Sequence, residues 1–165
     1  MIKMNKLNIV LIGFMGCGKS TIGKKLAKEM NYYFIDSDRE IENEIEMSIS
    51  DFFTTYGESK FRSIEEKIIS KIASSRDTVI ATGGGIIKNS NNITTLRDRG
   101  ILFYLKASPE HIYQNVKCDT TRPLLNTENK LETIKNLLNE RSSLYESASD
   151  FTIDISNQSI DDSVF

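Results

Sequence analysis

The chain has 165 residues, 39% of them hydrophobic and 27% charged, which is the size and composition of one ordinary globular domain. Its net charge of −2 comes from interspersed basic and acidic residues, so neither nucleic acid nor a membrane surface is expected as its main partner. The short polar start argues against a signal peptide, and the lack of a long apolar run argues against a membrane span. The two cysteines, Cys17 and Cys118, are too few for a disulfide framework and lack the spacing of a metal site. A cytoplasmic location is therefore expected.

Short apolar runs alternate with helical stretches along the whole chain. The predicted strands are Leu7–Ile12, Tyr32–Ile35, Thr78–Thr82, Ile101–Leu105 and Phe151–Ile155. The predicted helices are Lys19–Met30, Ser37–Met47, Glu58–Ser74, Ile93–Arg99, Pro109–Val116 and Lys130–Leu144. This alternation is typical of an α/β fold with a parallel sheet, and no linker or repeat divides residues 1–165 into two domains. Ligands of such sheets bind beyond the carboxyl ends of the strands, so polar residues that follow a strand are candidates for a site.

Residues 13–20, with the sequence GFMGCGKS, fit the phosphate-loop pattern G-x-x-x-x-G-K-S/T and lie between a predicted strand and a predicted helix. Such a loop aims backbone N–H groups and a helix N-terminus at one anion, and Gly13, Gly16 and Gly18 permit the unusual backbone angles. Lys19 is expected to reach the β- and γ-phosphates, and the Ser20 hydroxyl to bind Mg²⁺. The sequence therefore predicts a nucleoside triphosphate site.

Two aspartates, Asp36 and Asp38, follow the second predicted strand. Residues two apart on an extended segment share a side, so both carboxylates can point toward the γ-phosphate. Asp36 would then lie near Mg²⁺, and Asp38 would orient or deprotonate a substrate hydroxyl. The alternative is that these residues only cap the following helix.

Three glycines, Gly83–Gly85, follow the third predicted strand. Consecutive glycines are costly in backbone entropy, and they leave bare amides against which a substrate anion or hydroxyl can bind, for example at the Gly84 N–H. A purely structural loop is the alternative.

Three arginines are candidates for binding anions. Arg62 precedes Glu65 by three residues and is either half of a surface ion pair or a guanidinium held to bind a carboxylate bidentately. Arg122 lies in a polar stretch, Lys117–Asn129, that could be a mobile lid over the transferred phosphoryl group. Arg141 ends a predicted helix and could equally complement its dipole.

The ordered motifs GFMGCGKST, DSD, FRSIEE, TGGG, RPLL and RSSLY resemble those of shikimate kinases over roughly residues 7–157. The resemblance implies a three-layer P-loop kinase fold like that of nucleoside monophosphate kinases, with a five-stranded parallel sheet flanked by helices. It further implies a substrate-binding region at about 36–64 and a lid at about 115–129 within one domain. The implied reaction is transfer of the ATP γ-phosphate to the 3-hydroxyl of shikimate, on the route to chorismate and the aromatic amino acids. The expected partners are ATP and shikimate, with Mg²⁺ as cofactor and a monomeric protein.

The resemblance also implies a role for each motif residue. The expected phosphate-binding residues are Gly16, Cys17, Gly18, Lys19, Ser20, Thr21 and the lid arginine Arg122. Ser20 binds Mg²⁺ with support from Asp36, and Asp38 is the base that holds the substrate hydroxyls. Lys19 and Arg122 stabilise charge on the transferred group. The expected substrate-binding residues, besides Asp38, are Arg62 and Arg141 on the carboxylate, Gly83, Gly84 and Gly85 through the backbone, and Phe53 and Phe61 on the pocket wall.

Some positions depart from the pattern of the family. Asn115 stands seven residues before Arg122, where many relatives carry an arginine that stacks on adenine, and Lys117 nearby is a poor substitute. Residues 156–158 (SNQ) replace basic residues of a second adenine-contacting loop, so weak base contacts are expected. The lone histidine, His111, is predicted to lie on the surface away from every motif. Cys17, at a helix N-terminus beside Lys19, is predicted to be a reactive thiol.

Two alternative functions remain at this point. Another small-metabolite kinase of the same fold, such as a gluconate kinase, shares the phosphate loop but should lack the later arginine motifs. A GTPase switch would need a guanine-reading N-K-x-D motif, which the segment Asn129–Glu132 (NKLE) resembles only superficially.

Overall fold

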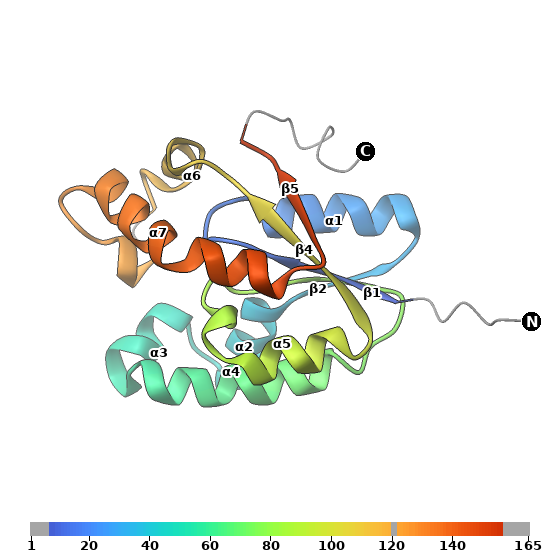
Figure 1. Ribbon diagram of the computed structural model, residues 1–165. Helices are drawn as coiled ribbons and strands as arrows, with labels where there is room; N and C mark the ends of the chain where they lie inside the picture. Colours follow the sequence, from blue (N-terminus) through green and yellow to red (C-terminus); the bar gives the residue numbers. More distant parts are fainter. Residues whose placement is uncertain (1–6, 120–121, 157–165) are drawn as a thin grey trace, which may run out of the picture.

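The computed structural model describes residues 7–119 and 122–156. Its centre is one parallel five-stranded sheet in the order β2-β3-β1-β4-β5. The strands are β1 (Asn8–Ile12), β2 (Tyr33–Asp36), β3 (Thr78–Ala81), β4 (Gly100–Lys106) and β5 (Phe151–Asp154). Helix α1 lies on one face of the sheet, and α4 and α5 lie on the other (Figure 1). The α/β class, the parallel sheet and the three layers predicted from the sequence are confirmed.

The helices follow the predicted pattern with one addition. Their bounds are α1 (Lys19–Met30), α2 (Ser37–Ile45), α3 (Ile49–Tyr56), α4 (Glu58–Ile72), α5 (Ser90–Arg97), α6 (Pro109–Val116) and α7 (Lys130–Ala148), with 3₁₀ turns η1 (Ile86–Lys88) and η2 (Pro123–Leu125). Helix α3 was not predicted, although Ser48 caps it by accepting from the Asp51 N–H and Gly57 (φ 83°) ends it. Among the described residues, no helix combines the length and the apolar character needed to cross a bilayer.

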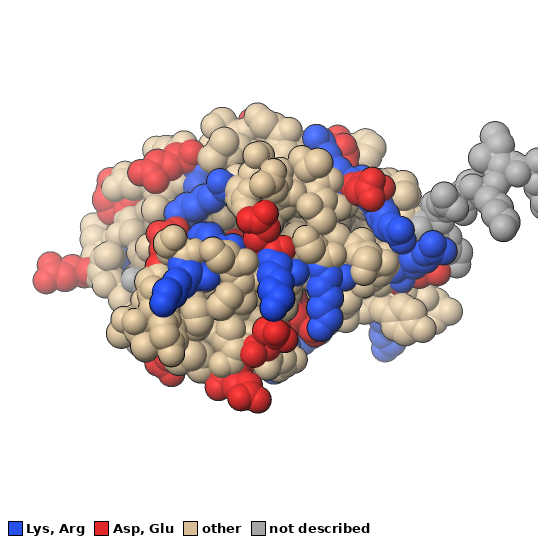
Figure 2. Space-filling model, turned by 90° about the horizontal axis from the view of Figure 1, so that it is seen from below, with Lys and Arg blue, Asp and Glu red and all other residues tan. Residues whose placement is uncertain are grey.

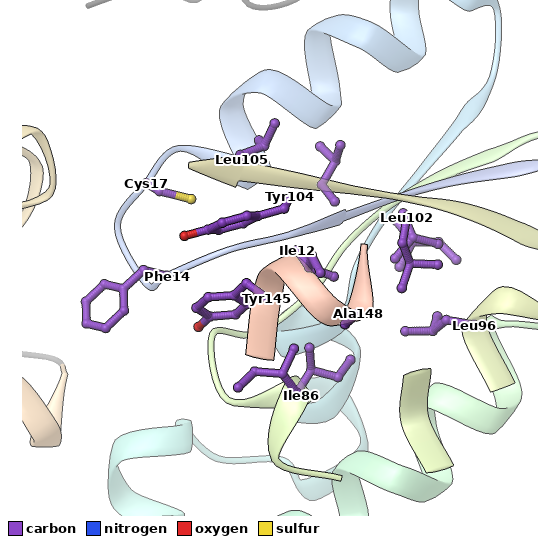
Figure 3. Packing of buried hydrophobic residues seen from close by; sticks show 14 of the residues in the cluster. Ile12, Phe14, Cys17, Ile86, Leu96, Leu102, Tyr104, Leu105, Tyr145 and Ala148 are labelled. Atoms are coloured by element: carbon purple, nitrogen blue, oxygen red, sulfur yellow. The ribbon is translucent and has the colours of Figure 1, made fainter. Parts of the chain in front are cut away.

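Helix α7 runs four residues beyond its predicted end because its last turn packs into the core. Tyr145 is fully buried and stacks on Tyr104 of β4, with ring centroids 5.1 Å apart and ring planes at 21°. Figure 3 shows the two rings between β4 and α7, with Phe14 and Cys17 beside them. A buried aromatic pair of this kind adds stabilisation beyond its buried area and so outweighs the polar sequence of the helix.

Hydrogen bonds between neighbouring strand ends bring the segments after β1, β2 and β3 to one edge of the sheet. The Thr82 hydroxyl donates to the carbonyl of Leu11 at 2.8 Å, and the N–H of Gly83 donates to the buried hydroxyl of Ser37 at 3.1 Å. These segments carry the phosphate loop, the aspartate pair and the glycine run. The edge of the sheet thus collects the residues that the sequence singled out.

Candidate active site

The phosphate loop connects β1 to α1, as predicted, and opens into a cavity of about 400 Å³. Gly16 and Gly18 have φ values of 78° and 107°, which L side chains rarely adopt. Gly18 is also the N-cap of α1 and brings no side chain to that helix end. The first N–H groups of α1 therefore remain available to an anion in the cavity.

Lys19 is the first residue of α1, directly after the loop, and it is almost fully buried. Its Nζ donates to the carbonyls of Gly13 at 2.7 Å and Phe14 at 2.9 Å, and it lines the same cavity. The third printed contact of this ammonium is to Cys17 Sγ at 3.7 Å. Because sulfur is a weak acceptor, a phosphate oxygen can replace it while the two carbonyls hold the ammonium at a fixed place.

Ser20 and Asp36 form the other side of this cavity. The Ser20 hydroxyl donates to Asp36 Oδ2 at 2.6 Å, and Asp36 Oδ1 accepts from the N–H groups of Asp38 at 3.0 Å and Arg39 at 3.4 Å. Asp36 thus caps α2, as the structural alternative predicted, and it also contacts the phosphate loop through Ser20, while its place near Mg²⁺ stays a prediction. A hydroxyl and a carboxylate beside a phosphate site are hard oxygen ligands, and this donor set fits Mg²⁺.

Asp38 lies where the first cavity meets a second one of about 620 Å³. Burial raises the pKa of its carboxyl to about 6, and the negative charges of Asp36 and Glu65 act in the same direction. Lys19 and Arg122 partly offset this shift. A carboxyl of this kind can accept a proton near neutral pH, as a general base must.

The second cavity is walled by α2, α3, α4 and the glycine run. It contains the predicted substrate residues Phe53, Phe61 and Arg62, and the two phenylalanine rings lie 4.8 Å apart between centroids. Arg62 Nη1 donates to Glu65 Oε1 at 2.9 Å. Glu65 is 1% exposed, and burial raises its pKa despite the neighbouring guanidinium. The ion pair predicted as the alternative for Arg62 therefore exists, but it lies in the wall of a cavity and not on an open surface.

The glycine run packs too closely for any side chain. A Cβ at Gly83 would lie 2.6 Å from Asp38 Oδ1, and one at Gly84 would lie 2.9 Å from the Met15 N atom. A Cβ at Gly85 would collide with the guanidinium of Arg62. The three glycines thus allow Asp38, the phosphate loop and Arg62 to converge, which is the close approach that the sequence suggested.

Arg141 is placed differently from the other two arginines. It is 3% exposed, its guanidinium lies 5.9 Å from the ring centroid of Phe14, and neither described cavity includes it among its lining residues. Its Nη1 has no hydrogen-bond acceptor among the described residues. A buried guanidinium whose Nη1 has no acceptor among the described residues retains a donor that can serve an anion.

Arg122 lines both cavities and pairs with Asp119, with Nε 3.0 Å from Asp119 Oδ2. Within the predicted lid, the structure describes the end of α6 and the turn η2. Thr120 and Thr121, which the sequence placed beside Arg122, lie outside the described residues. Lys130, which follows the segment, connects back to its beginning: its Nζ donates to the carbonyls of Val116 at 3.2 Å and Asp119 at 2.5 Å.

Comparisons with known proteins agree with this geometry. The shikimate kinase family model matches residues 15–165. The chain belongs to the shikimate kinase family. A shikimate kinase of Thermodesulfovibrio yellowstonii is 48% identical over 147 residues, which are 89% of this chain and 84% of the relative. The solved shikimate kinase of Acinetobacter baumannii in complex with shikimate is 38% identical, with a TM-score of 0.90 over 94% of this chain and 86% of that one.

The family assignment disfavours both alternative functions. A gluconokinase of Sinorhizobium meliloti is only 14% identical at a TM-score of 0.57, which shows a shared fold alone. The segment that resembles a guanine-reading motif has a structural role instead. Asn129 is the N-cap of α7, with its side chain accepting from the Glu132 N–H at 3.1 Å. The protein is thus an ATP-dependent kinase of the shikimate kinase family.

One expectation from the sequence is wrong for this family member, and the surroundings of a second residue differ from those expected. His111 is not remote from the motifs, because it lines the phosphate-loop cavity and its Nδ1 lies 3.0 Å from the carbonyl oxygen of Ser156. The four-residue spacing of His111 and Asn115 puts both on one face of α6, a signal that could have placed the histidine. Cys17 occupies the predicted helix N-terminus but is only 1% exposed, because its Sγ points toward Tyr104 (Figure 3). Burial therefore opposes rapid reaction of Cys17 with reagents in solution, and its reactivity stays a prediction.

Proposed function

We propose that the protein transfers the γ-phosphoryl group of ATP to the 3-hydroxyl of shikimate. Two cavities that share a wall support this transfer, because Met15, Asp38, Gly83, Gly84 and Arg122 line both of them. The phosphate-loop cavity would hold the triphosphate, and the second cavity would hold the acceptor. Asp38 would then lie beside the hydroxyl that attacks the phosphoryl group.

Asp38 would orient the attacking hydroxyl and accept its proton, for which its raised pKa is suited. Lys19 and Arg122 would stabilise the negative charge on the transferred group. Arg122 must exchange Asp119 for phosphate oxygens, and both partners are anionic, so the exchange conserves its charge pairing. Closure of the lid over about residues 115–129 would exclude water, which would otherwise hydrolyse ATP.

Mg²⁺ would be held by Ser20 with support from Asp36, together with phosphate oxygens of ATP. Bound there, the ion would neutralise charge on the β- and γ-phosphates. The Ser20–Asp36 hydrogen bond supports this assignment, since it already brings both oxygens to the edge of the phosphate-loop cavity.

The substrate carboxylate would bind to Arg62, which Glu65 and Glu58 hold in one pose. Arg141 would join it once the substrate is bound, supplying the buried donor that has no acceptor among the described residues. Gly83–Gly85 would contact the substrate through the backbone, and Phe53 and Phe61 would cover its ring, within a substrate-binding region at about 36–64.

Residues 1–165 would act as one domain and as a monomer, in the cytoplasm, where ATP is supplied. Acidic and basic side chains lie side by side over the face seen in Figure 2, a pattern that supports a small-molecule partner and not a polyanion.

The test is an assay with ATP, Mg²⁺ and shikimate in which the product is identified by mass. Shikimate 3-phosphate and ADP are expected. Gluconate and a nucleoside monophosphate serve as competing acceptors, and a higher kcat/KM for either would contradict the proposed function.

A further inference from the structure

Asn115 in the last turn of α6 reaches across to the phosphate loop. Its Nδ2 donates to the carbonyl oxygen of Gly16 at 2.8 Å, and because a carbonyl oxygen can only accept, the amide nitrogen is the donor. Asn115 also lines the phosphate-loop cavity. Its amide is therefore engaged with the protein's own backbone at the edge of the nucleotide site.

This hydrogen bond fixes the C=O of the peptide group between Gly16 and Cys17, and a second hydrogen bond fixes the N–H of the same group. The C=O and N–H of a trans peptide point in opposite directions, and the N–H of Cys17 donates to the carbonyl of Phe14 at 3.2 Å. The peptide plane between Gly16 and Cys17 cannot rotate without breaking both bonds. Its orientation sets the path of the chain into Gly18 and the first N–H groups of α1, which face the cavity.

Packing between α6 and the phosphate loop also restrains the loop at Gly16. Gly16 has a φ of 78°, and a Cβ there would collide with the side chain of Val116, the residue after Asn115. Helix α6 thus approaches the loop at Gly16 so closely that only hydrogen fits between them. The Asn115 amide provides the polar half of this contact.

We infer that Asn115 is a positioning residue that holds the phosphate loop in the conformation that binds the triphosphate, instead of contacting the nucleobase. The inference rests on the proposed function only in that the cavity takes the triphosphate of ATP. Lys117, the other candidate for the base, donates to Gln114 Oε1 at 3.0 Å and does not line the cavity among the described residues.

The test compares ATP with inorganic tripolyphosphate, which carries the phosphates without a base. Binding of each, with Mg²⁺, is measured by calorimetry on the wild type, on Asn115→Ala and on Gln114→Ala. Gln114 is the matched control, because it carries an exposed amide on the same helix outside the cavities described here. Loss of one hydrogen bond should weaken binding of both ligands to Asn115→Ala by the same factor, roughly 3- to 10-fold.

Gln114→Ala should bind both ligands as the wild type does, and the KM for shikimate should be unchanged in both variants. Weaker binding of ATP alone by Asn115→Ala would assign the residue to the nucleobase and overturn the inference. Unchanged binding of both ligands, or an equal loss in Gln114→Ala, would overturn it as well. A wild-type protein that bound neither ligand would contradict the proposed function of the cavity itself.

Discussion

The phenol of Tyr145 donates a hydrogen bond to the carbonyl oxygen of Gly84 and so ties α7 to the glycine run after β3. Tyr145 is fully buried and stacked on Tyr104, which leaves its hydroxyl a single pose. Gly84 lines both cavities. The bond therefore fixes a backbone segment at the point where the proposed donor and acceptor meet.

Tyr145→Phe should raise the KM for shikimate by roughly 3- to 10-fold, because the Gly84 carbonyl loses a hydrogen bond worth about 1 kcal/mol while the ring keeps its packing. The KM for ATP should change less, since the phosphate loop has its own supports. Steady-state kinetics with each substrate varied in turn measure both values. Tyr33→Phe, at a phenol that is 76% exposed, is the matched control and should have no effect. An equal rise in both KM values would instead mean a general loosening of the site.

Much of the fold follows from local sequence. Period and composition were sufficient for the five strands, and the phosphate loop was predictable because three glycines, a lysine and a serine at fixed spacing have one common use. Helix α3 was missed because Ile49–Tyr56 is only 8 residues long, so its apolar pattern spans little more than two turns, and its cap at Ser48 is ambiguous when seen alone. The extension of α7 likewise depends on the stacking of Tyr145 on Tyr104, which is a contact between distant segments.

The site likewise contains features that the sequence could predict and features that it could not. Asp36 ends β2, and Asp38 and Gly83–Gly85 come just after strands, so their convergence could be expected from the parallel sheet. The burial of Cys17 could not, because it depends on which way one side chain turns out of the loop. The bond from Asn115 to Gly16 joins residues 99 positions apart in the chain, and no spacing rule connects them.

Arg62→Lys should raise the KM for shikimate by at least about tenfold and leave the KM for ATP nearly unchanged. An ammonium cannot reproduce the planar, two-point contact of a guanidinium with a carboxylate, and it cannot also keep the bonds to Glu65 and Glu58. Kinetics at saturating ATP measure the effect.

Gly85→Ala tests the position of the Arg62 guanidinium without changing Arg62 itself. The added methyl group would collide with the Arg62 guanidinium and should give a similar rise without removing the charge. Full activity in both variants would leave Arg62 as a structural ion pair of α4.

Thiol reagents should modify Cys118 well before Cys17. Cys118 is exposed, whereas Cys17 is 1% exposed and faces Tyr104. Labelling with a small aromatic disulfide, followed by peptide mass analysis, should find Cys118 labelled first and Cys17 only as the protein opens. Cys118→Ser should therefore show slow labelling, and rapid modification of Cys17 in that variant would show that the loop turns its thiol outward in solution.

Asp38→Asn should lower kcat by at least about 100-fold, the usual contribution of a general base, with ATP binding nearly intact. For the wild type, the acidic limb of kcat/KM should have its midpoint near pH 6, where burial places the pKa of this carboxyl.

Asp38→Asn should also stabilise the ligand-free protein at neutral pH. A carboxyl whose folded pKa is raised from 3.8 to about 6 binds its proton more tightly in the folded state, so its ionised form costs stability above about pH 6. That cost is about 1–3 kcal/mol and fades as the pH falls toward 3.8. The melting temperature of Asp38→Asn should therefore exceed that of the wild type by roughly 2–10 °C at pH 7.5 and by much less at pH 4.5. A difference that is the same at both pH values would mean that the ionised carboxyl is well solvated, and Asp38 would then have no raised pKa with which to accept the proton.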